Sequence, residues 1–570
     1  METTYKLAIV GGGPAGIGIF VRAARLGYLD QLLTDGVVLI HDGPIATLGR
    51  GKLGDYIINS NTFAKSLLGS VLDEKLELDP PESIEGTYLK SLSAHPSAQR
   101  LAQVGNASVS LIELGKFLEA VGYATRLEMM KYPKTSDCLT DTKATKIERT
   151  DKDLCKITTT RDGVESIFWA KNVVLAMGGT QQLPPPADLD PCYLSKTWTS
   201  DKVLCEPGRR ELAAALSNAK DKKVCIIGGS HSSFSVAWVL LNKMHPKSKT
   251  DDAKPIQFNA KDITILHRGA IRCFYNTRKE AEADGVVVDK SDRAGNINTF
   301  TGLREDAKAL FMAASTGHEP RVKLYQVKRG APGAALRKQA FDGASAIIWC
   351  CGYTTKMIPI IDHSMDKAFS ISRGAVRVDL KGQVIDNAGE SLPWLFGVGI
   401  GFCLRAAVDE MKEETRADGV TVYHRRGATL VLAAVFGNCI YGKDCTSFEE
   451  MIEKCEKRRK EDKQHESKIP LTPSMSKKRI SQPLTDEAHV QNQLIIAPRK
   501  SSLTARKESS PTKQNKNQTI DETKAIRRSS FELGRHTSLS HSIKAPKSCG
   551  KPMLAGSAQH AIRSIRTGVL

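Results

Sequence analysis

Short apolar runs alternate with glycine-containing turns and amphipathic stretches through the first part of the chain. The first run, residues 5–10, leads into the turn at residues 11–16 (Gly-Gly-Gly-Pro-Ala-Gly) and then into a helical pattern over residues 17–26. Residues 37–40 form the next run with the character of a buried strand. The order strand, glycine turn, helix and strand predicts a βαβ unit, and with it a parallel sheet covered by helices.

The same arrangement recurs about two hundred residues later. Residues 223–227 predict a strand, residues 228–230 (Gly-Gly-Ser) a turn, residues 234–241 a helix and residues 263–266 the second strand. Further apolar runs at residues 172–177, 344–349 and 394–398 predict three more buried strands, and the alternating stretch at residues 145–160 predicts a β-hairpin. The turn at residues 350–353 would return the chain to the first unit, whose last strand would be residues 394–398, so we expect the second unit to be inserted in the first.

The C-terminal part has a different character. Ser447 is a suitable N-cap for an amphipathic helix over residues 446–467. Residues 468–570 are rich in Ser, Thr, Lys, Arg and Gln and poor in aromatic residues, so burial there cannot offset chain entropy and we expect a disordered basic tail. The tail holds much of the net charge of +19, which suits an acidic partner, and its Arg-Lys-Ser-Ser and Arg-Arg-Ser-Ser motifs are typical of phosphorylation sites, although chance matches are at least as good an interpretation.

Composition narrows the class and the compartment. The chain has 570 residues, of which 41% are hydrophobic and 25% charged, as in a globular protein of several domains. The 13 cysteines show no metal-ligand spacing and include no C-x-x-C pair, which favours reduced thiols in the cytoplasm and predicts no metal site. The longest apolar stretch, residues 428–436, is far shorter than the ~20 residues that span a bilayer, so we expect no transmembrane segment.

The first glycine turn has the pattern that a dinucleotide pyrophosphate requires. Gly11 suits the tight turn, Gly13 the close approach of the backbone, and Gly16 the packing of helix on strand, while Pro14 and Ala15 begin a helix whose N-terminus faces the phosphates. An acidic residue after the second strand binds a ribose hydroxyl in this pattern. Asp42 is the candidate for that contact, with His41 in the neighbouring register.

The second turn is a weaker version of the first. Gly228 keeps its place, whereas Ser230 and Ser233 stand where glycines are usual; serine is small enough for close packing, and its hydroxyl can bond phosphate. Arg268 follows the second strand of this unit, where a 2′-phosphate would lie, and it favours NADPH over NADH. A vestigial turn that binds nothing, and a surface arginine without a role, stay open as alternatives.

Taken together, these motifs resemble those of flavoproteins with two dinucleotide-binding domains. Residues 175–179 (Leu-Ala-Met-Gly-Gly) and residues 349–353 (Trp-Cys-Cys-Gly-Tyr) are similar to the family's crossings between domains, and the second resembles its ATGY element. Residues 395–399 resemble the late FAD motif, although its usual acidic residue is replaced by Ile400. The resemblance implies FAD at Gly178 and Gly399 as well as at the first turn, in an α/β fold of two Rossmann-like domains.

The domain limits implied are residues 1–215 and 343–445 for the FAD-binding domain and residues 216–342 for the inserted NAD(P)H-binding domain. The resemblance extends over about residues 1–440 and is nearest to class B flavin monooxygenases, including the N-hydroxylating ornithine and lysine enzymes. It implies a small-molecule substrate and oxygen as co-substrate, because the cysteine pair with which disulfide reductases relay electrons is missing. No catalytic residue stands out. A reductase or oxidase of the same fold, and a flavin-binding regulatory or scaffold protein, remain alternatives.

Two further segments are candidates for the surroundings of the flavin and the substrate. Residues 54–62 follow the Asp42 turn, and their polar groups would either reach the flavin or cap the next helix. Residues 274–276 and 298–302 would line a substrate entrance or form ordinary loops.

Overall fold

A computed structural model gives the arrangement of the chain. It describes residues 3–72, 83–150, 153–184, 189–244, 256–286, 297, 302–328, 330–363, 371–372, 375–404, 426–442, 444–448, 450–451, 453–454 and 457. The predicted basic tail with its phosphorylation motifs, residues 298–301, and nearly all of the predicted helix beyond residue 454 lie outside the described residues. At the start of that helix, the Glu450 amide donates to the Ser447 hydroxyl at 3.2 Å, as expected of an N-cap.

The centre of the first lobe is a parallel sheet. Strand β1 (Thr4–Val10) pairs in parallel with β2 (Val37–Ile40) and with β6 (Val164–Leu175), and β2 pairs in parallel with β3 (Ser136–Leu139). Strand β18 (Ser391–Gly397) pairs in parallel with the end of β6. The late strand therefore returns to the first sheet after the inserted segment, as predicted. These strands belong to a sheet of 12 strands, and we call this part the twelve-stranded lobe.

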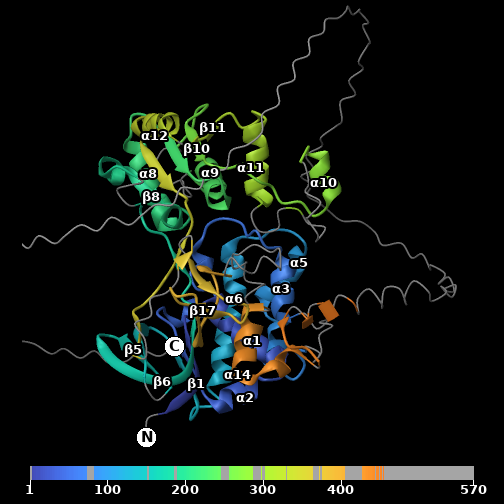
Figure 1. Ribbon diagram of the computed structural model, residues 1–570. Helices are drawn as coiled ribbons and strands as arrows, with labels where there is room; N and C mark the ends of the chain where they lie inside the picture. Colours follow the sequence, from blue (N-terminus) through green and yellow to red (C-terminus); the bar gives the residue numbers. More distant parts are fainter. Residues whose placement is uncertain are drawn as a thin grey trace, which may run out of the picture. The chain divides into compact units, whose positions relative to one another are not determined.

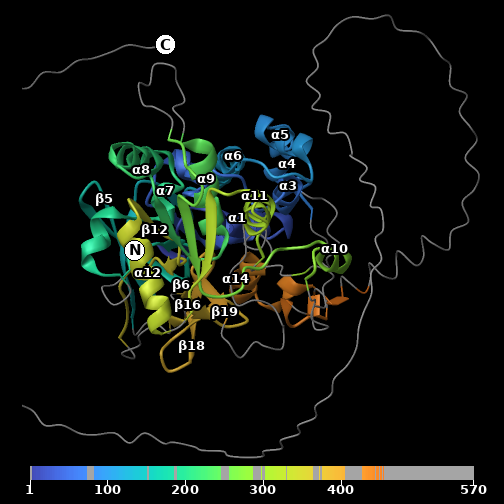
Figure 2. The same ribbon diagram turned by 90° about the horizontal axis from the view of Figure 1, so that it is seen from above.

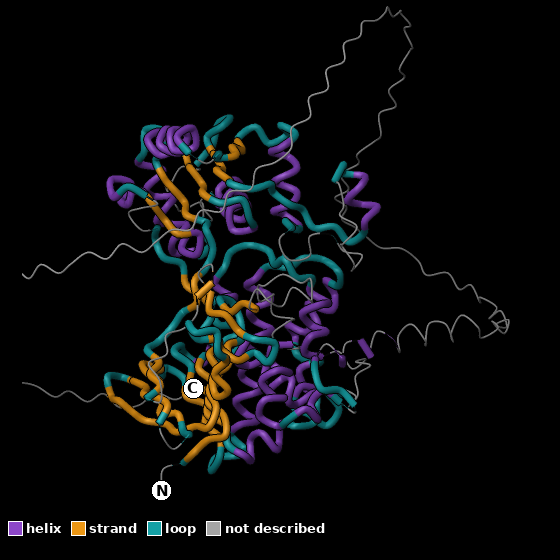
Figure 3. The backbone as a smooth tube through the Cα atoms, in the orientation of Figure 1, coloured by secondary structure: helices purple, strands orange, loops and turns teal. Residues whose placement is uncertain are grey.

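Helices cover one face of this sheet. Helices α1 (Pro14–Arg25), α6 (Leu111–Met129) and α14 (Ala428–Phe436) share one apolar core with inward-facing residues of β1 and β2. Helices α1 and α14, blue and orange in Figure 1, lie side by side. The buried Arg22 of α1 donates to the Thr429 hydroxyl of α14 at 2.8 Å. Figure 3 shows the helices gathered in a layer beside the strands.

An antiparallel extension packs on the other face. Strands β4 (Lys143–Arg149) and β5 (Cys155–Arg161) form the predicted hairpin, and β5 continues by antiparallel pairing onto the first half of β6. The run at residues 172–177 is therefore the end of a strand that starts at Val164, because a twelve-residue strand is long enough to serve both layers.

The inserted segment forms the five-stranded lobe, an all-parallel sheet in the order β11 (Val322–Gln326), β10 (Ile263–His267), β9 (Val224–Ile227), β12 (Ala346–Trp349) and β8 (Thr197–Thr199). Helices α8 (Glu206–Asn218), α9 (His231–Lys243) and α11 (Glu305–Ser315) pack on one face, and α12 (Ala331–Gly343) packs on the other. Figure 2 shows α8 and α9 on one side of these strands and α12 opposite. The boundary at residue 216 stays a prediction; β8 precedes that residue, α8 spans it, and both elements pack in this lobe.

Two short strands mark the crossings between the lobes. Strand β7 (Gly179–Thr180) leaves the twelve-stranded lobe, and β13 (Thr354–Thr355) returns to it; they pair antiparallel. Strand β7 begins at the last residue of the predicted crossing at residues 175–179, and β13 directly follows the one at residues 349–353.

The other elements are smaller. They are α2 (Leu29–Asp35), η1 (Ile45–Thr47), η2 (Leu53–Asp55), α3 (Ala64–Leu72), α4 (Leu89–Leu92), α5 (Pro96–Val104), η3 (Pro191–Lys196), α7 (Ser200–Val203), α10 (Arg278–Ala283), β14 (Ile360–Asp362), β15 (Ile371–Ser372), β16 (Ala375–Val378), β17 (Gln383–Ile385), β19 (Phe402–Leu404) and η6 (Asn438–Tyr441). None of the helices in the described part of the chain has the length and hydropathy needed to cross a membrane.

Candidate functional site

The first glycine turn is tightly packed from within at two of its positions. Gly11 has φ +117°, and a Cβ atom there would lie 2.4 Å from the Ala176 carbonyl oxygen. A Cβ atom at Gly16 would lie 2.0 Å from the carbonyl oxygen of Gly11. No side chain fits at either position, so the fold itself requires both glycines.

Gly13 is different, because nothing inside the protein excludes a side chain there. The nearest atom to an added Cβ is the Gly51 Cα, at 3.8 Å, which is an ordinary contact distance. Gly13 is the N-cap of α1, and the first intrahelical bond runs from the Ile17 amide to its carbonyl at 3.0 Å. With no side chain at Gly13, the backbone amides of the first turn of α1 are left uncovered at that position. This arrangement fits a pyrophosphate group.

The ends of β6 and β18 bring two more predicted residues to this turn. Gly399 has φ +103°, and an added Cβ would come within 3.0 Å of the Ala15 Cβ. Gly178 has φ +74°, and no heavy atom lies within 4 Å of an added Cβ. The Val398 amide donates to the Leu175 carbonyl at 3.0 Å and aligns the two strand ends. The structure therefore gathers Gly11, Gly13, Pro14, Ala15, Gly16, Gly178 and Gly399 at one edge of the sheet.

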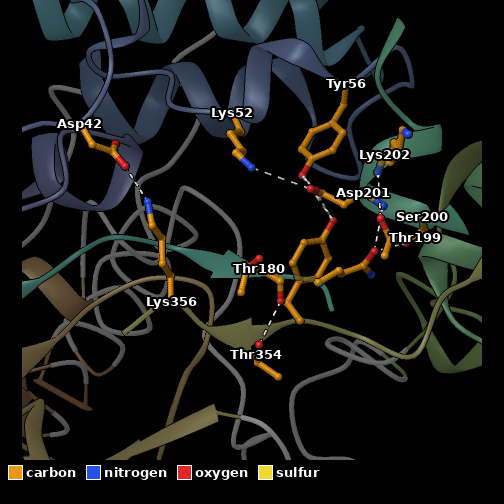
Figure 4. A network of polar contacts seen from close by, with 12 residues as sticks. Asp42, Lys52, Tyr56, Thr180, Thr199, Ser200, Asp201, Lys202, Thr354 and Lys356 are labelled. Carbon is orange, nitrogen blue, oxygen red and sulfur yellow. Dashed lines mark hydrogen bonds and ion pairs between the residues drawn. The ribbon is translucent and has the colours of Figure 1, made fainter. Parts of the chain in front are cut away.

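Asp42 lies beyond the end of β2 and is engaged by a residue that the sequence did not indicate. Its carboxylate pairs with the Lys356 ammonium at 2.6 Å, and both side chains are about half exposed (Figure 4). Burial is the largest single influence on Asp42 and would raise its pKa, but the Lys356 bond and charge, helped by His41, outweigh it and hold that pKa below the ordinary value. A ribose hydroxyl would meet a carboxylate that already has a cationic partner.

His41 is hydrogen-bonded to the backbone of the first glycine turn. The Gly12 amide donates to His41 Nδ1 at 3.3 Å, and His41 Nε2 lies 2.8 Å from the Thr47 hydroxyl. Burial lowers the pKa of His41, although Asp42 and Asp141 act in the opposite direction. The neutral ring fits its acceptor role toward Gly12.

The backbone of the second glycine turn, at Gly228, lies against the backbone of the returning crossing at Cys350. Gly228 has φ +135°, and a Cβ atom there would lie 2.7 Å from both the Cys350 carbonyl oxygen and the Ser233 hydroxyl. Ser233 is fully buried, which favours close packing as its role, whereas Ser230 is exposed at the N-cap of α9. Arg268 is exposed just after β10, and a Cβ at Gly229 would lie 2.8 Å from the His267 Cβ, so the ends of β9 and β10 adjoin.

His231 opens α9 beside this turn. Its Nε2 lies 3.0 Å from the Gly302 carbonyl oxygen, to which it donates as a neutral ring, and its buried Nδ1 has no hydrogen-bond partner among the described residues. Burial is the main reason that the pKa of His231 falls to about 4, and the nearby Arg304 lowers it further.

The segment at residues 54–62 runs along the five-stranded lobe, a contact that its sequence did not predict. The Ile57 amide donates to the Leu204 carbonyl at 2.9 Å, and the Tyr56 hydroxyl donates to Asp201 (Figure 4). Asn59 donates to Asp306 of α11 at 2.7 Å. At the other predicted segment, the Phe274 amide donates to Leu303 at 2.9 Å, so the loop is anchored by its own backbone.

Vicinal Cys350 and Cys351 do not form a disulfide in the structure. Cys350 is buried and Cys351 exposed, and burial raises the pKa of the Cys350 thiol to about 12. A thiol held in its protonated form is a poor nucleophile, which favours the structural interpretation of this pair.

Two Rossmann-like lobes, one inserted in the other and each with a glycine turn at the carboxyl ends of its strands, define an oxidoreductase that brings two dinucleotides together. The chain belongs to the pyridine nucleotide-disulphide oxidoreductase family, whose model matches residues 5–389. It is an FAD-dependent enzyme that exchanges electrons with a pyridine nucleotide, which confirms the predicted class and cofactors.

Among curated proteins, the chain is 25% identical over 452 residues to CMP-5'-(3-aminopropyl)phosphonate hydroxylase of Streptomyces rubellomurinus, covering 76% of this chain and 98% of the relative. Among solved structures, it is similar to an ornithine N-hydroxylase from Kutzneria sp. 744 (12% identity, TM-score 0.46) and to L-lysine 6-monooxygenase from Pseudomonas syringae (13% identity, TM-score 0.45). Each alignment covers 76% of this chain and 99% of the other. At TM-scores below 0.5 these likenesses establish no activity for this chain.

Proposed function

We propose that this enzyme is a flavin monooxygenase, in which NADPH reduces the bound FAD and oxygen is the second substrate for hydroxylation of a small molecule. The observation that carries the proposal is the absence from the whole sequence of a C-x-x-C or C-x4-C pair, although the family is named for disulfide chemistry. The buried, protonated Cys350 thiol does not replace such a pair. A hydroxylase aligned over 98% of its length supports this choice.

The residues divide into two sets by lobe. In the twelve-stranded lobe, the amides at residues 11–16 would hold the FAD pyrophosphate, Gly178 and Gly399 would leave room for the rest of the cofactor, and Asp42 would meet the ribose. In the five-stranded lobe, Gly228, Ser230 and Ser233 would shape the NADPH turn, and Arg268 would pair with the 2′-phosphate. Bound FAD supplies hydride acceptance and the reaction with oxygen.

The substrate class follows from the curated relative and is part of the proposal. The printed substrate of that relative carries a 3-aminopropyl group. Compounds with a primary amine on a short alkyl chain are therefore the first to test. Neither the predicted cytoplasmic location nor an acidic partner of the tail has further support, and both stay predictions.

One series of measurements tests the proposal. Anaerobic titration with NADPH and with NADH should bleach the flavin absorption, with NADPH the faster donor. In air, oxygen consumption should then rise with a primary amine and appear as hydroxylated product with little peroxide. Stoichiometric peroxide at every substrate would indicate an oxidase, and flavin that neither donor reduces would indicate a regulatory flavoprotein; either outcome overturns the monooxygenase.

A further inference from the structure

One carboxylate joins two tyrosines from distant parts of the chain. Asp201 Oδ1 accepts from the Tyr56 hydroxyl and, at 3.1 Å, from the Tyr353 hydroxyl, and the two hydroxyl oxygens lie 3.3 Å apart. Figure 4 shows Tyr56 and Asp201 pointing toward each other from different elements. We call Tyr56, Asp201 and Tyr353 the crossing clamp.

Each member of the crossing clamp belongs to a different part of the molecule. Tyr56 directly follows η2 of the twelve-stranded lobe. Asp201 lies in α7, directly after β8 of the five-stranded lobe. Tyr353 precedes β13, the crossing that returns. The Asp201 side chain of the inserted lobe is thus hydrogen-bonded both to the other lobe and to one crossing.

The outgoing crossing is tied to the same point. Gln181 Oε1 accepts from the Asp201 amide at 2.8 Å and from the Ser200 hydroxyl at 3.0 Å. A Cβ atom at Gly179 would lie only 3.0 Å from the Tyr353 Cβ, so the two crossings approach closely. Helix α7 is therefore hydrogen-bonded to both connections between the lobes and to the segment at Tyr56.

The crossing clamp is largely sheltered from water. The Asp201 side chain is 23% exposed, and its other neighbour, the Lys52 ammonium, is 75% exposed and 3.9 Å away, so it contributes little. Burial is the largest cause that raises the pKa of both tyrosine hydroxyls far above the ordinary value. Both tyrosines therefore stay donors throughout any ordinary assay.

We propose that Asp201 is a positioning residue for hydride transfer: the crossing clamp holds the nicotinamide-binding lobe and the FAD-binding lobe in the relation that transfer requires. Asp201 lies in neither dinucleotide turn, so it acts through the orientation of the lobes. Transfer rates are sensitive to placement, and an error of about 1 Å costs on the order of 100-fold. The proposal rests on the flavin and pyridine nucleotide chemistry of the family and is independent of the oxygen step.

The test compares Asp201→Ala and the double variant Tyr56→Phe/Tyr353→Phe with the wild type, using the holoenzyme and whichever of NADPH or NADH reduces it faster. Stopped-flow anaerobic reduction gives the limiting rate constant and the Kd for the donor separately. We expect the rate constant to fall about 10- to 100-fold, with the Kd changed less than about threefold. Asp201→Asn keeps an acceptor oxygen and should recover most of the rate.

The matched control is Tyr193→Phe, which removes a tyrosine–aspartate bond of 2.6 Å to Asp342 that lies within the five-stranded lobe. It should leave the rate constant unchanged. Hydrogen exchange supplies a readout that needs no reduction: the Ile57 amide, bonded to Leu204, should exchange faster in Asp201→Ala and not in Tyr193→Phe. A rate constant of Asp201→Ala within twofold of wild type, or a loss confined to the Kd, would overturn the proposal. If neither donor reduces the wild type but the Ile57 amide exchanges faster in Asp201→Ala, the result contradicts the proposed enzyme activity and not the structural role of the crossing clamp.

Discussion

Gly399 lies directly on Ala15: a Cβ atom added to Gly399 would come within 3.0 Å of the Ala15 Cβ. The two residues are far apart in the sequence, and the pairing of β18 with β6 beside β1 brings them together. The contact joins the late glycine motif to the first residues of α1. The proposed FAD site is therefore one surface made from three strand ends.

The bare backbone at Gly13 leads to a first prediction. Gly13→Val should leave a folded protein, because no atom lies closer than 3.8 Å to the new Cβ, but it should fill the space proposed for the pyrophosphate. We expect the Kd for FAD to rise at least about 100-fold, or about 2.7 kcal/mol, measured by titrating apoprotein with FAD. Gly343→Val, at a position with no atom within 4 Å of the added Cβ, is the control. An unchanged affinity in folded Gly13→Val would refute the proposed site.

Donor choice gives a second prediction, which depends on the exposed Arg268. Arg268→Ala should raise the Kd for NADPH about tenfold or more and leave that for NADH within about twofold, because only NADPH carries the 2′-phosphate. Anaerobic flavin reduction by each donor measures both constants. Arg337→Ala, an exposed arginine on α12, should change neither. Equal effects on the two donors would remove Arg268 from the site.

The ion pair between Lys356 and Asp42 predicts a small contribution to stability that depends on pH. The pKa of Asp42 is lowered in the folded protein, so the pair stabilises above the ordinary carboxyl pKa and loses its effect as the pH falls through the lowered value. Both groups are about half exposed, so Lys356→Met should cost less than about 1 kcal/mol at about pH 7. Urea unfolding should show this difference shrinking and then vanishing as the pH falls below the ordinary carboxyl pKa and through the lowered pKa of Asp42. A difference that stays constant throughout this acid range would mean that Lys356 acts through packing.

His231 predicts that the free energy of unfolding depends more strongly on pH in mildly acid solution. Its pKa is about 4 in the folded protein and near the ordinary 6.5 when unfolded, so the unfolded chain binds more protons between these values and stability falls as the pH drops through that window. The loss from pH 7 to pH 5 should be about 2 kcal/mol in urea unfolding. His231→Gln should remove most of this slope, whereas His318→Gln, at an exposed site, should keep it. An equal slope in all three proteins would exclude His231 as its source.

The sequence by itself determined the elements whose signals are local. Strand runs such as residues 37–40 and 263–266 and the helix after Gly13 were predicted within a few residues, because apolar periodicity and glycine turns depend on neighbours in the chain. The insertion of one lobe in the other was also predicted, from the return turn at residues 350–353, the late strand at residues 394–398 and the resemblance to two-domain flavoproteins. The FAD-dependent class rested on the same motifs.

Only the tertiary structure decided which side chains meet. Lys356 reaches Asp42, His41 supports Gly12, and Tyr56 and Tyr353 converge on Asp201, although no spacing in the sequence connects these positions. The tertiary structure also decided that Gly13, unlike Gly11 and Gly16, borders open space. The physical reason is that a hydrogen bond or a close contact depends on distances of a few ångströms, and for residues hundreds of positions apart those distances exist only once the sheets and crossings have formed.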